Sequence, residues 1–400
     1  MKTAEVYLLE CTPEFDKGYT YKLNFECETG MFVTVPFGKG NKSRTGIVLC
    51  VNELPDDEVK YKIKEVIEID RHYPQLDSEA LILAKWMQTR YICSFGDAVR
   101  SMLPPASAGR NVKYAMTAIE TKTLQGLIES GAVKKEPQIK IIEALIKEED
   151  AISVKDLMQI GNCSISVINT MVKRGYLSLI ERKQEDASDD GPHEAYPEHE
   201  LNREQQEVFT GISELLDRKN FCEVLMQGVT GSGKTEVYMH LISKVLAEGG
   251  NAIVLVPEIS LTPQMSARFK GRFGNNVAVL HSRLGDRERR KQWEALKEGR
   301  VSIVVGARSA VFAPFLHVRL IIIDEEHENT YKSDNTPRFH AAEIARQRCL
   351  SSSGVVIYGS ATPSVETFYK AISGKINYFK ISNRANKCPM PGTVIVDMRQ

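Results

Sequence analysis

The sequence predicts a multidomain protein in which a small β-rich domain and a winged helix precede an α/β P-loop domain with a parallel sheet. Three observations carry this prediction. A glycine-rich loop at residues 228–235 follows a short apolar stretch and precedes an amphipathic one. From residue 223 to residue 358, apolar runs alternate with helical periodicity, which predicts parallel strands covered by helices on both faces. Ahead of this region, apolar runs separated by turns give way to helical repeats.

The composition is that of an ordinary globular protein, long enough for two or three domains. Of the 400 residues, 42% are hydrophobic and 26% are charged. Lys plus Arg and Asp plus Glu both number 52, so a nucleic-acid partner needs a local basic surface. No apolar run approaches the ~20 residues of a membrane span, and the first residues begin no signal peptide, so no membrane partner is expected.

The eight cysteines are scattered along the chain, and none forms a C-x-x-C pair. This spacing indicates neither a zinc site nor a disulfide framework within these residues. Unpaired thiols in a reducing cytoplasm are the expected state.

Residues 1–108 are predicted to form the β-rich domain. Apolar runs with turn residues between them indicate strands at 6–9, 31–35 and 46–51. Helical periodicity at 76–91 follows, and the prolines at 104 and 105 end this region. The glycine-rich stretch 35–44 carries three cations, one of which is Lys39. This stretch is either a solvated turn or a contact to phosphate.

Residues 109–183 are predicted to form the winged helix. Amphipathic helices are expected at 138–147, 154–160 and 164–174, followed by a strand at 175–180. This is the element order of a winged helix. The third helix carries only Lys173 and Arg174 near its end, so reading of DNA and docking of a protein are equal alternatives for it.

An acidic linker is predicted at 184–200, because seven carboxylates, two prolines and no Lys or Arg cannot build a core. The P-loop domain then occupies residues 201–400. Its strands are expected at 223–226, 252–256, 277–280, 302–305, 319–323 and 355–358. The P-loop follows the first of these strands, at the carboxyl end where such sheets bind ligands.

The P-loop reads Gly-Val-Thr-Gly-Ser-Gly-Lys-Thr and fits G-x-x-x-x-G-K-[ST]. Its glycines let backbone N–H groups turn toward phosphates without a Cβ in the way. Lys234 can reach the β- and γ-phosphates, and Thr235 can ligate Mg²⁺. A Gly/Ser-rich connector, the alternative, leaves the strand before the loop and the helix after it unexplained. The candidate nucleotide-binding residues are Gly228, Thr230, Gly231, Ser232, Gly233, Lys234 and Thr235.

A second stretch points to hydrolysis. An apolar strand at 320–323 ends in Asp324, Glu325, a further glutamate and His327. At the end of a strand Asp324 can hold Mg²⁺, while Glu325 orients and activates the attacking water. His327 is a candidate coupler between the nucleotide and the molecule on which the protein acts. For the carboxylates alone, a solvated acidic helix start is the alternative.

The order of these motifs resembles that of superfamily 2 helicases. The Asp-Glu-Glu-His run and Gly-Ser-Ala-Thr-Pro-Ser at 359–364 resemble helicase motifs II and III. The stretches 257–264 and 306–310 look like the DNA-contacting motifs Ia and Ib. The segment 201–205 is similar to the one whose glutamine recognises adenine. The resemblance thus adds Gln205 to the nucleotide site and implies DNA contacts by Thr262, Arg308 and Ser309.

A narrower resemblance, to the bacterial replication-restart helicases of the primosome, covers nearly the whole chain. It rests on the motifs above and on amino-terminal stretches at 19–21, 35–38 and 103–105. The resemblance implies an ATP- and Mg²⁺-dependent 3′-to-5′ DNA helicase that recognises stalled or abandoned forks and starts primosome assembly. The implied partners are forked and single-stranded DNA, single-stranded DNA-binding protein and helicase-loading proteins. The implied location is the bacterial cytoplasm, at the nucleoid.

The same resemblance assigns further DNA contacts. It implies that the amino-terminal domain binds the 3′ end of a nascent strand, and that residues 328–340 form an aromatic-rich loop linking single-stranded DNA to ATP hydrolysis. The DNA-binding candidates from these regions are Tyr19, Thr20, Tyr21, Lys39, Tyr331, Lys332 and Arg338.

The chain departs from the family pattern at several places. Ala342 and Glu343 stand where the family usually has Arg and Asp, and Thr20 stands where some members have an acidic residue. Family members continue with a second helicase lobe holding an arginine finger and with a module of two zinc sites. The zinc expected of the family therefore comes from no residue of this chain. A fragment and a natural truncation are both compatible with the sequence.

Two other functions compete with the helicase. A fork-binding scaffold without motor activity would use nucleotide binding only to gate its conformation. A P-loop kinase leaves Gly-Ser-Ala-Thr and the place of Asp-Glu-Glu-His unexplained.

Overall fold

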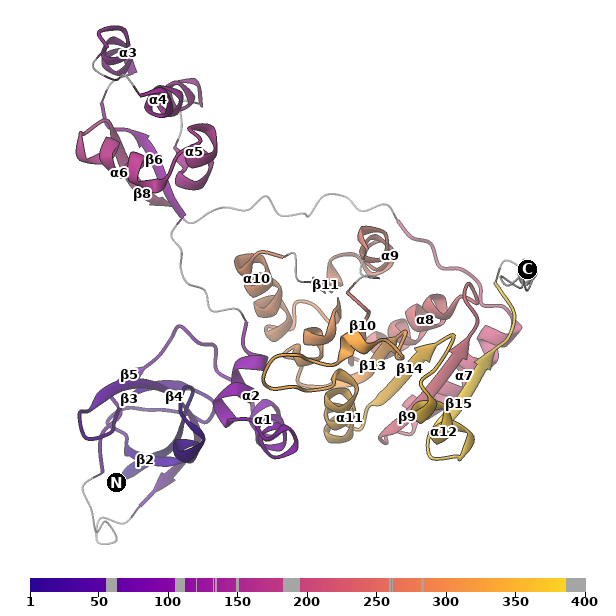
Figure 1. The fold of residues 1–400 in the computed structure, drawn as a ribbon. Coiled ribbons are helices and arrows are strands. Elements are labelled where there is room, and N and C mark those ends of the chain that lie inside the picture. The colour runs from indigo at the N-terminus through magenta and orange to yellow at the C-terminus, as the bar shows by residue number, and fades with distance from the viewer. Residues whose placement is uncertain are drawn as a thin grey trace, which may run out of the picture. The chain divides into compact units, whose positions relative to one another are not determined.

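The computed structural model shows two compact units, which are described separately (Figure 1). One consists of residues 1–106 and 192–400, and the other of residues 107–191. The structure describes residues 1–54, 63–104, 112–119, 121–131, 133, 135–148, 151–182, 195–258, 260, 262–281 and 284–385.

A seven-stranded, wholly parallel sheet forms the centre of the first unit, in the order β11-β12-β10-β13-β14-β9-β15. The strands are β9 Cys222–Gly228, β10 Asn251–Leu255, β11 Val277–Leu280, β12 Ile303–Gly306, β13 Val318–Asp324, β14 Val355–Ser360 and β15 Asn377–Ile381. All six strands expected from the sequence are present. The sequence did not predict β15, because this edge strand is mostly exposed and lacks a buried apolar run.

Helices cover both faces of this sheet. They are α7 Arg203–Asp217, α8 Lys234–Ala247, α9 Pro263–Phe273, α10 Asp286–Lys297, α11 Ala341–Ser352 and α12 Val365–Ile372. Successive β13 residues pack into opposite cores: Leu320 and Ile322 join α7, α8 and α9, whereas Ile321 and Ile323 join α10 and α11. Burial on both faces explains why the strand reads as a continuous apolar run.

The amino-terminal residues form a separate antiparallel sheet in the order β2-β1-β4-β3-β5. Its strands are β1 Lys2–Leu8, β2 Tyr19–Lys22, β3 Phe32–Phe37, β4 Lys42–Glu53 and β5 Glu68–Ile69. The β-rich prediction is confirmed, with β2 and β5 in addition to the three expected strands. Both additional strands are short, so they carry little periodicity.

Two helices, rather than the one expected, follow this sheet. Helix α1 spans Ser78–Tyr91 and begins where Asp77 accepts a hydrogen bond from the Ala80 N–H at 2.8 Å. Ile92 has a left-handed φ of 50° and ends α1. Ser94 then caps α2, Phe95–Met102. The end of α1 lies against the P-loop domain, where Arg90 and Tyr91 contact Glu343.

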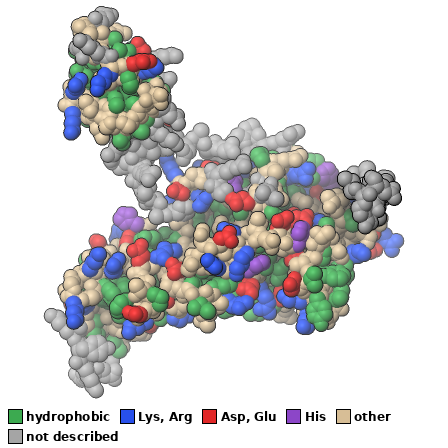
Figure 2. All heavy atoms as spheres, in the orientation of Figure 1, with side chains coloured by type: hydrophobic (Ala, Val, Ile, Leu, Met, Phe, Trp, Pro, Cys, Tyr) green, Lys and Arg blue, Asp and Glu red, His purple; other side chains and the backbone are tan. Residues whose placement is uncertain are grey.

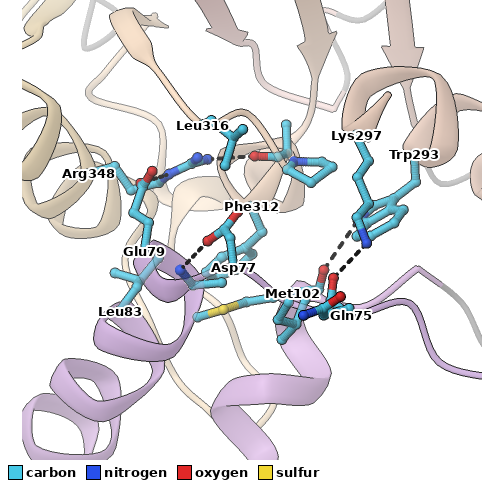
Figure 3. A pocket seen from close by; sticks show the side chains of 14 residues that line it. Gln75, Asp77, Glu79, Leu83, Met102, Trp293, Lys297, Phe312, Leu316 and Arg348 are labelled. Carbon is cyan, nitrogen blue, oxygen red and sulfur yellow. Dashed lines mark hydrogen bonds and ion pairs between the residues drawn. The ribbon is translucent and has the colours of Figure 1, made fainter. Parts of the chain in front are cut away.

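One hydrophobic core joins the amino-terminal sheet to the P-loop domain. Tyr7, Met87 and Phe95 belong to the same buried cluster as Trp293 and Ile344. The Trp293 indole N–H also donates to the Met102 carbonyl at 3.3 Å (Figure 3). The two parts therefore pack as a single unit.

A buried arginine reinforces this junction. Arg348 of α11, only 5% exposed, donates to the carboxylate of Glu79 on α1 at 3.1 Å (Figure 3). Its other nitrogens donate to the carbonyl oxygens of Val311, Ala313 and Phe315 at 2.7–2.9 Å. A guanidinium with this many partners keeps its charge when buried.

The second unit contains the helices expected there, as α4 Glu136–Glu148, α5 Val154–Ile160 and α6 Ile165–Lys173. The expected strand is β8 Leu177–Arg182. The sequence did not predict β6 Val112–Thr117 and α3 Thr121–Glu129. In its three-stranded sheet, β6 lies between β8 and β7, Ile152–Ser153, and is antiparallel to both.

The partner of β8 is therefore β6, which precedes the helices, and no hairpin follows α6 within the described part of this unit. The winged-helix assignment stays a prediction. The acidic linker predicted at 184–200 falls largely on residues 183–194, which lie outside the described residues.

We expect Arg348→Met to lower the free energy of unfolding by about 3–5 kcal/mol, because it removes a charged donor from the Glu79 carboxylate and from three buried carbonyls. Glu79→Gln should cost less, about 1–2 kcal/mol, because burial already raises the pKa of this carboxyl despite Arg348. Urea denaturation of both variants measures the difference. Equal losses would contradict the bonding assigned to Arg348.

Candidate nucleotide site and DNA-binding segments

Three predicted motifs meet at one edge of the parallel sheet. The P-loop follows β9, the Gly-Ser-Ala-Thr segment runs out of β14, and Asp-Glu-Glu-His ends β13. These strands are neighbours, and Gly359 of β14 lies in register with both Asp324 and Met226. Because parallel strands end at the same edge, residues a hundred positions apart come together. Figure 1 shows β9, β14 and β13 side by side.

The P-loop has the backbone expected of a phosphate cradle. Gly231 and Gly233 have φ values of +79° and +80°, a region that glycine occupies without strain. A Cβ at Gly228 would lie 2.6 Å from the Ser232 hydroxyl. That hydroxyl is buried and has no hydrogen-bond partner among the described residues. It therefore fits a loop whose missing partner is an anion, at the start of α8.

The two P-loop side chains of the catalytic prediction lie at the start of α8. Lys234 is 8% exposed, and its ammonium donates to the Gly228 carbonyl at 3.0 Å. It lies 3.7 Å from the carboxylate of Glu325. Thr235 follows it and is half-buried, whereas Thr230 at the tip of the loop is exposed. The structure thus brings Lys234 together with the acidic end of β13.

Gln205 has a structural role that the sequence did not indicate. Its amide N–H donates to the Ser232 carbonyl at 2.8 Å, and its amide oxygen accepts from the Asn202 N–H at 2.9 Å. Asn202 in turn accepts from the Gln205 N–H, which completes a capping box. Gln205 therefore supports the P-loop from the first turn of α7. Adenine recognition by this residue stays a prediction.

Asp324 is held by a residue that was not a candidate. The Tyr238 hydroxyl donates to its carboxylate at 3.0 Å, and a Cβ at Gly359 would overlap that hydroxyl. Burial, followed by the charge of Glu325, raises the pKa of Asp324. Tyr238 lies at the helical spacing of the apolar residues around it, so the sequence did not distinguish it from an ordinary core residue.

Glu325 adopts a left-handed conformation, with a φ of 45°. This conformation is uncommon for a residue with a side chain. One carboxylate oxygen lies 3.7 Å from Lys234, and the other lies 3.7 Å from the His327 imidazole. The turn therefore directs Glu325 toward the P-loop.

The next two residues of the motif connect it to the segment after β14. The His327 imidazole lies 2.9 Å from the Ser360 hydroxyl, which accepts from the Thr362 N–H at 3.1 Å. Glu326, which was not a candidate, accepts from the N–H of Ser364 at 2.6 Å. These contacts give His327 a physical connection to motif III, although its coupling role stays a prediction.

The candidates in the 328–340 segment differ in accessibility. Lys332 and Arg338 are exposed, but Tyr331 is 1% exposed. The Tyr331 hydroxyl donates to the backbone carbonyls of Asp324 and, at 3.1 Å, of Leu255. The Tyr331 ring therefore belongs to the core, and its hydroxyl ties this segment to the end of β13, while a DNA contact by Tyr331 stays a prediction.

The candidates from motifs Ia and Ib also have structural roles. Arg308 donates to the carbonyls of Lys332 at 2.7 Å and Thr330 at 3.3 Å, which holds the 328–340 segment. Thr262 caps α9, and its hydroxyl accepts from the Met265 N–H at 3.2 Å. Ser309 and Thr262 are exposed. DNA contacts by these residues stay predictions.

The amino-terminal candidates lie on β2 and on the turn after β3. Thr20 and Lys39 are exposed. Tyr21 is 3% exposed and donates to the Pro36 carbonyl at 3.4 Å, and its DNA contact stays a prediction. The Tyr19 ring packs edge-on against the Phe37 ring, with 5.1 Å between the ring centres. Its buried hydroxyl has no hydrogen-bond partner in the part of the chain described.

The described residues contain no group of three or more His, Cys, Asp or Glu that could hold a metal by itself. None of the helices in the described ranges is long and apolar enough to span a membrane.

The model of DEAD/DEAH box helicases matches residues 202–371, and the model of the 3′ DNA-binding domain (3′BD) of PriA matches residues 8–104. Replication restart protein PriA of Bacillus subtilis strain 168 is 34% identical over 470 residues, covering 100% of this chain and 58% of the relative. PriA of Chlamydia trachomatis serovar D is 32% identical over 395 residues, covering 96% of this chain and 52% of the relative.

The chain belongs to the PriA family. It spans little more than half the length of these PriA relatives. Its helicase-like part begins one residue before α7, and its 3′ DNA-binding part ends just after α2. Among solved structures, RecG bound to a three-way DNA junction aligns with 46% of this chain and 24% of its own chain, at 23% identity and a TM-score of 0.36.

We expect Tyr238→Phe to weaken Mg²⁺-dependent nucleotide binding several-fold, because Asp324 loses the donor that fixes its carboxylate. Titration of Mg²⁺ against a fluorescent ATP analogue measures the change. Tyr358→Phe is the matched control. Tyr358, in β14, is also a buried tyrosine, and its hydroxyl donates to the Glu223 carboxylate at 2.8 Å. Equal nucleotide binding by both variants would contradict a role of Tyr238 in the nucleotide site.

Proposed function

We propose that this chain carries the DNA-end-binding domain and the first motor lobe of an ATP-dependent 3′-to-5′ DNA helicase. The helicase acts at stalled or abandoned replication forks and starts primosome assembly. The observation that carries the proposal is the convergence of Lys234, Asp324, Glu325 and His327 at one sheet edge, in a lobe that shares its core with a 3′ DNA-binding domain.

The residues of this edge divide the chemistry among themselves. Lys234, the Ser232 hydroxyl and the N–H groups of the P-loop bind the phosphates of ATP. Thr235 and Asp324 hold Mg²⁺, which when bound neutralises charge on the phosphates. Glu325, turned toward the loop, orients the attacking water and accepts its proton. His327 couples the nucleotide site to motif III through its contact with the Ser360 hydroxyl.

Exposed polar side chains supply the DNA contacts. Thr20 and Lys39 meet the strand end, while Ser309, Lys332 and Arg338 contact the single strand. Acidic and basic side chains are interspersed on the face that Figure 2 shows, so binding depends on local contacts to phosphates and weakens as salt rises. The partners are forked DNA, single-stranded DNA-binding protein and helicase-loading proteins, in the bacterial cytoplasm.

A fork-binding scaffold without motor activity is the second candidate. The shared core of the end-binding domain and the lobe favours it, because nucleotide binding can then alter DNA binding without a second lobe.

Lys234→Ala separates the two functions. In the full-length protein it should reduce DNA-stimulated ATP hydrolysis and unwinding by at least about 10³-fold, because the phosphates lose their main cation. Binding to a forked DNA should change less than twofold. Anisotropy with a labelled fork and a strand-displacement assay give the two readouts. Unwinding that survives in Lys234→Ala would contradict the motor.

The 400-residue chain by itself should bind nucleotide weakly and hydrolyse it poorly. Helicases of this class close the nucleotide between two lobes and receive a catalytic arginine from the second, and such an arginine is worth on the order of 10³–10⁵ in rate. Steady-state ATPase measurements with and without DNA test this expectation. DNA-stimulated turnover comparable with that of the full-length protein would contradict it.

A further inference from the structure

Helix α1 of the end-binding domain contacts helix α11 of the lobe near both ends of α1. At one end, Glu79 of α1 pairs with Arg348 of α11 at 3.1 Å (Figure 3). At the other end, Arg90 and the Tyr91 hydroxyl donate to the two carboxylate oxygens of Glu343, at 2.5 and 2.7 Å. The two helices therefore run in opposite senses.

The contact of Arg90 and Tyr91 with Glu343 is favoured by the charges of these residues and by the dipoles of the two helices. Glu343 is in the first turn of α11, and Arg90 is in the last turn of α1, so each charge also complements the dipole of its own helix. Burial alone would raise the pKa of Glu343, but the hydrogen bonds from Arg90 and Tyr91 lower it overall. Glu343 is thus held ionised between the two domains.

This contact reaches the 328–340 segment, which leads into α11. The His340 N–H points to the Tyr91 hydroxyl at 3.5 Å, and the Lys332 ammonium lies 5.8 Å from the centre of the Tyr91 ring. Lys332 and His340 are paired across the segment by a β-bridge. Tyr91 therefore touches both sides of the closed loop that these residues form.

The other end of the segment reaches the nucleotide site. Tyr331 donates to the Asp324 carbonyl, and Arg308 fixes the neighbouring carbonyls of Thr330 and Lys332. Asp324 and Glu325 follow one another at the end of β13, so a shift of the segment alters the backbone that carries both carboxylates.

In the opposite direction, α1 is bound to the residues just ahead of β2. The Asp16 carboxylate accepts from the Gln88 amide at 2.7 Å and from the Phe95 N–H at 3.0–3.1 Å. Asp16 lies three residues before Tyr19, the start of the strand with the DNA-end candidates. Contacts thus continue from Asp16, three residues ahead of β2, through α1 and Glu343 to the acidic end of β13.

We propose that Glu343, held by Arg90 and Tyr91, is a positioning residue through which a DNA 3′ end bound on the amino-terminal domain sets the 328–340 segment and stimulates hydrolysis in the lobe. This inference rests on the proposed helicase function. Its physical basis is the unbroken series of contacts from Asp16 to Asp324, and a change of affinity at one end must be coupled to the other if the series acts as a unit.

The test compares two single-stranded DNAs with the full-length protein. A linear strand offers a 3′ end, whereas a circular strand offers none. We expect Glu343→Gln to lose the additional ATPase stimulation given by the linear strand, by about 5-fold or more. Its stimulation by the circular strand and its affinity for a labelled 3′-ended fork should be unchanged. Tyr91→Phe, which removes the other donor, should act in the same direction.

Two controls accompany this test. Glu207→Gln removes an exposed carboxylate that pairs with Arg203 on α7 at 3.0 Å, and it should leave both stimulations unchanged. Exchange of the two charges, Arg90→Glu with Glu343→Arg, should restore part of the response to the linear strand.

Two outcomes would overturn the inference while leaving the helicase function intact. In one, Glu343→Gln keeps the full additional stimulation by the linear strand. In the other, both stimulations fall in equal proportion, as a merely local packing defect would produce. A wild-type protein that no DNA stimulates would instead overturn the proposed function, and the inference with it.

Discussion

Burial of both faces of the seven-stranded parallel sheet is the constraint on which the rest of the structure depends. Helices α7, α8 and α9 cover one face with residues of their own lobe. The other face is covered by α10 and α11 and shares its core with α1 and α2 of the amino-terminal domain. The amino-terminal domain therefore shares part of its hydrophobic core with the lobe, and the buried Arg348 bridges the two parts through Glu79.

The same sheet collects charges at one edge, where polar groups inside the fold control them. The Lys234 ammonium lies 3.7 Å from the Glu325 carboxylate, and the Tyr238 hydroxyl donates a hydrogen bond to the Asp324 carboxylate. Gln205 supports the P-loop through its hydrogen bond to the Ser232 carbonyl. Most of these supporting groups are buried, so their hydrogen bonds are worth more than exposed ones and are costly to leave unmade. The protein's own hydrogen bonds thus organise this edge of the sheet.

The start of α11 is anchored by Glu343, one of the two residues expected to depart from the family pattern. Its carboxylate reaches Arg90 and Tyr91. The 328–340 segment is held in addition by Arg308 and Tyr331. Anchoring of the segment therefore depends on contacts with the amino-terminal domain as well as on contacts within the lobe.

The sequence by itself determined the parallel strands, the P-loop and the acidic strand end, because each depends on local periodicity or on a short motif. It did not indicate the burial of Tyr21 and Tyr331 or the contacts of Tyr238 and Glu326, because burial and contacts are decided by neighbours distant in the chain. Arg90 and Glu343 are 253 positions apart. Only the tertiary structure could bring them together, since their meeting depends on how two domains share one core.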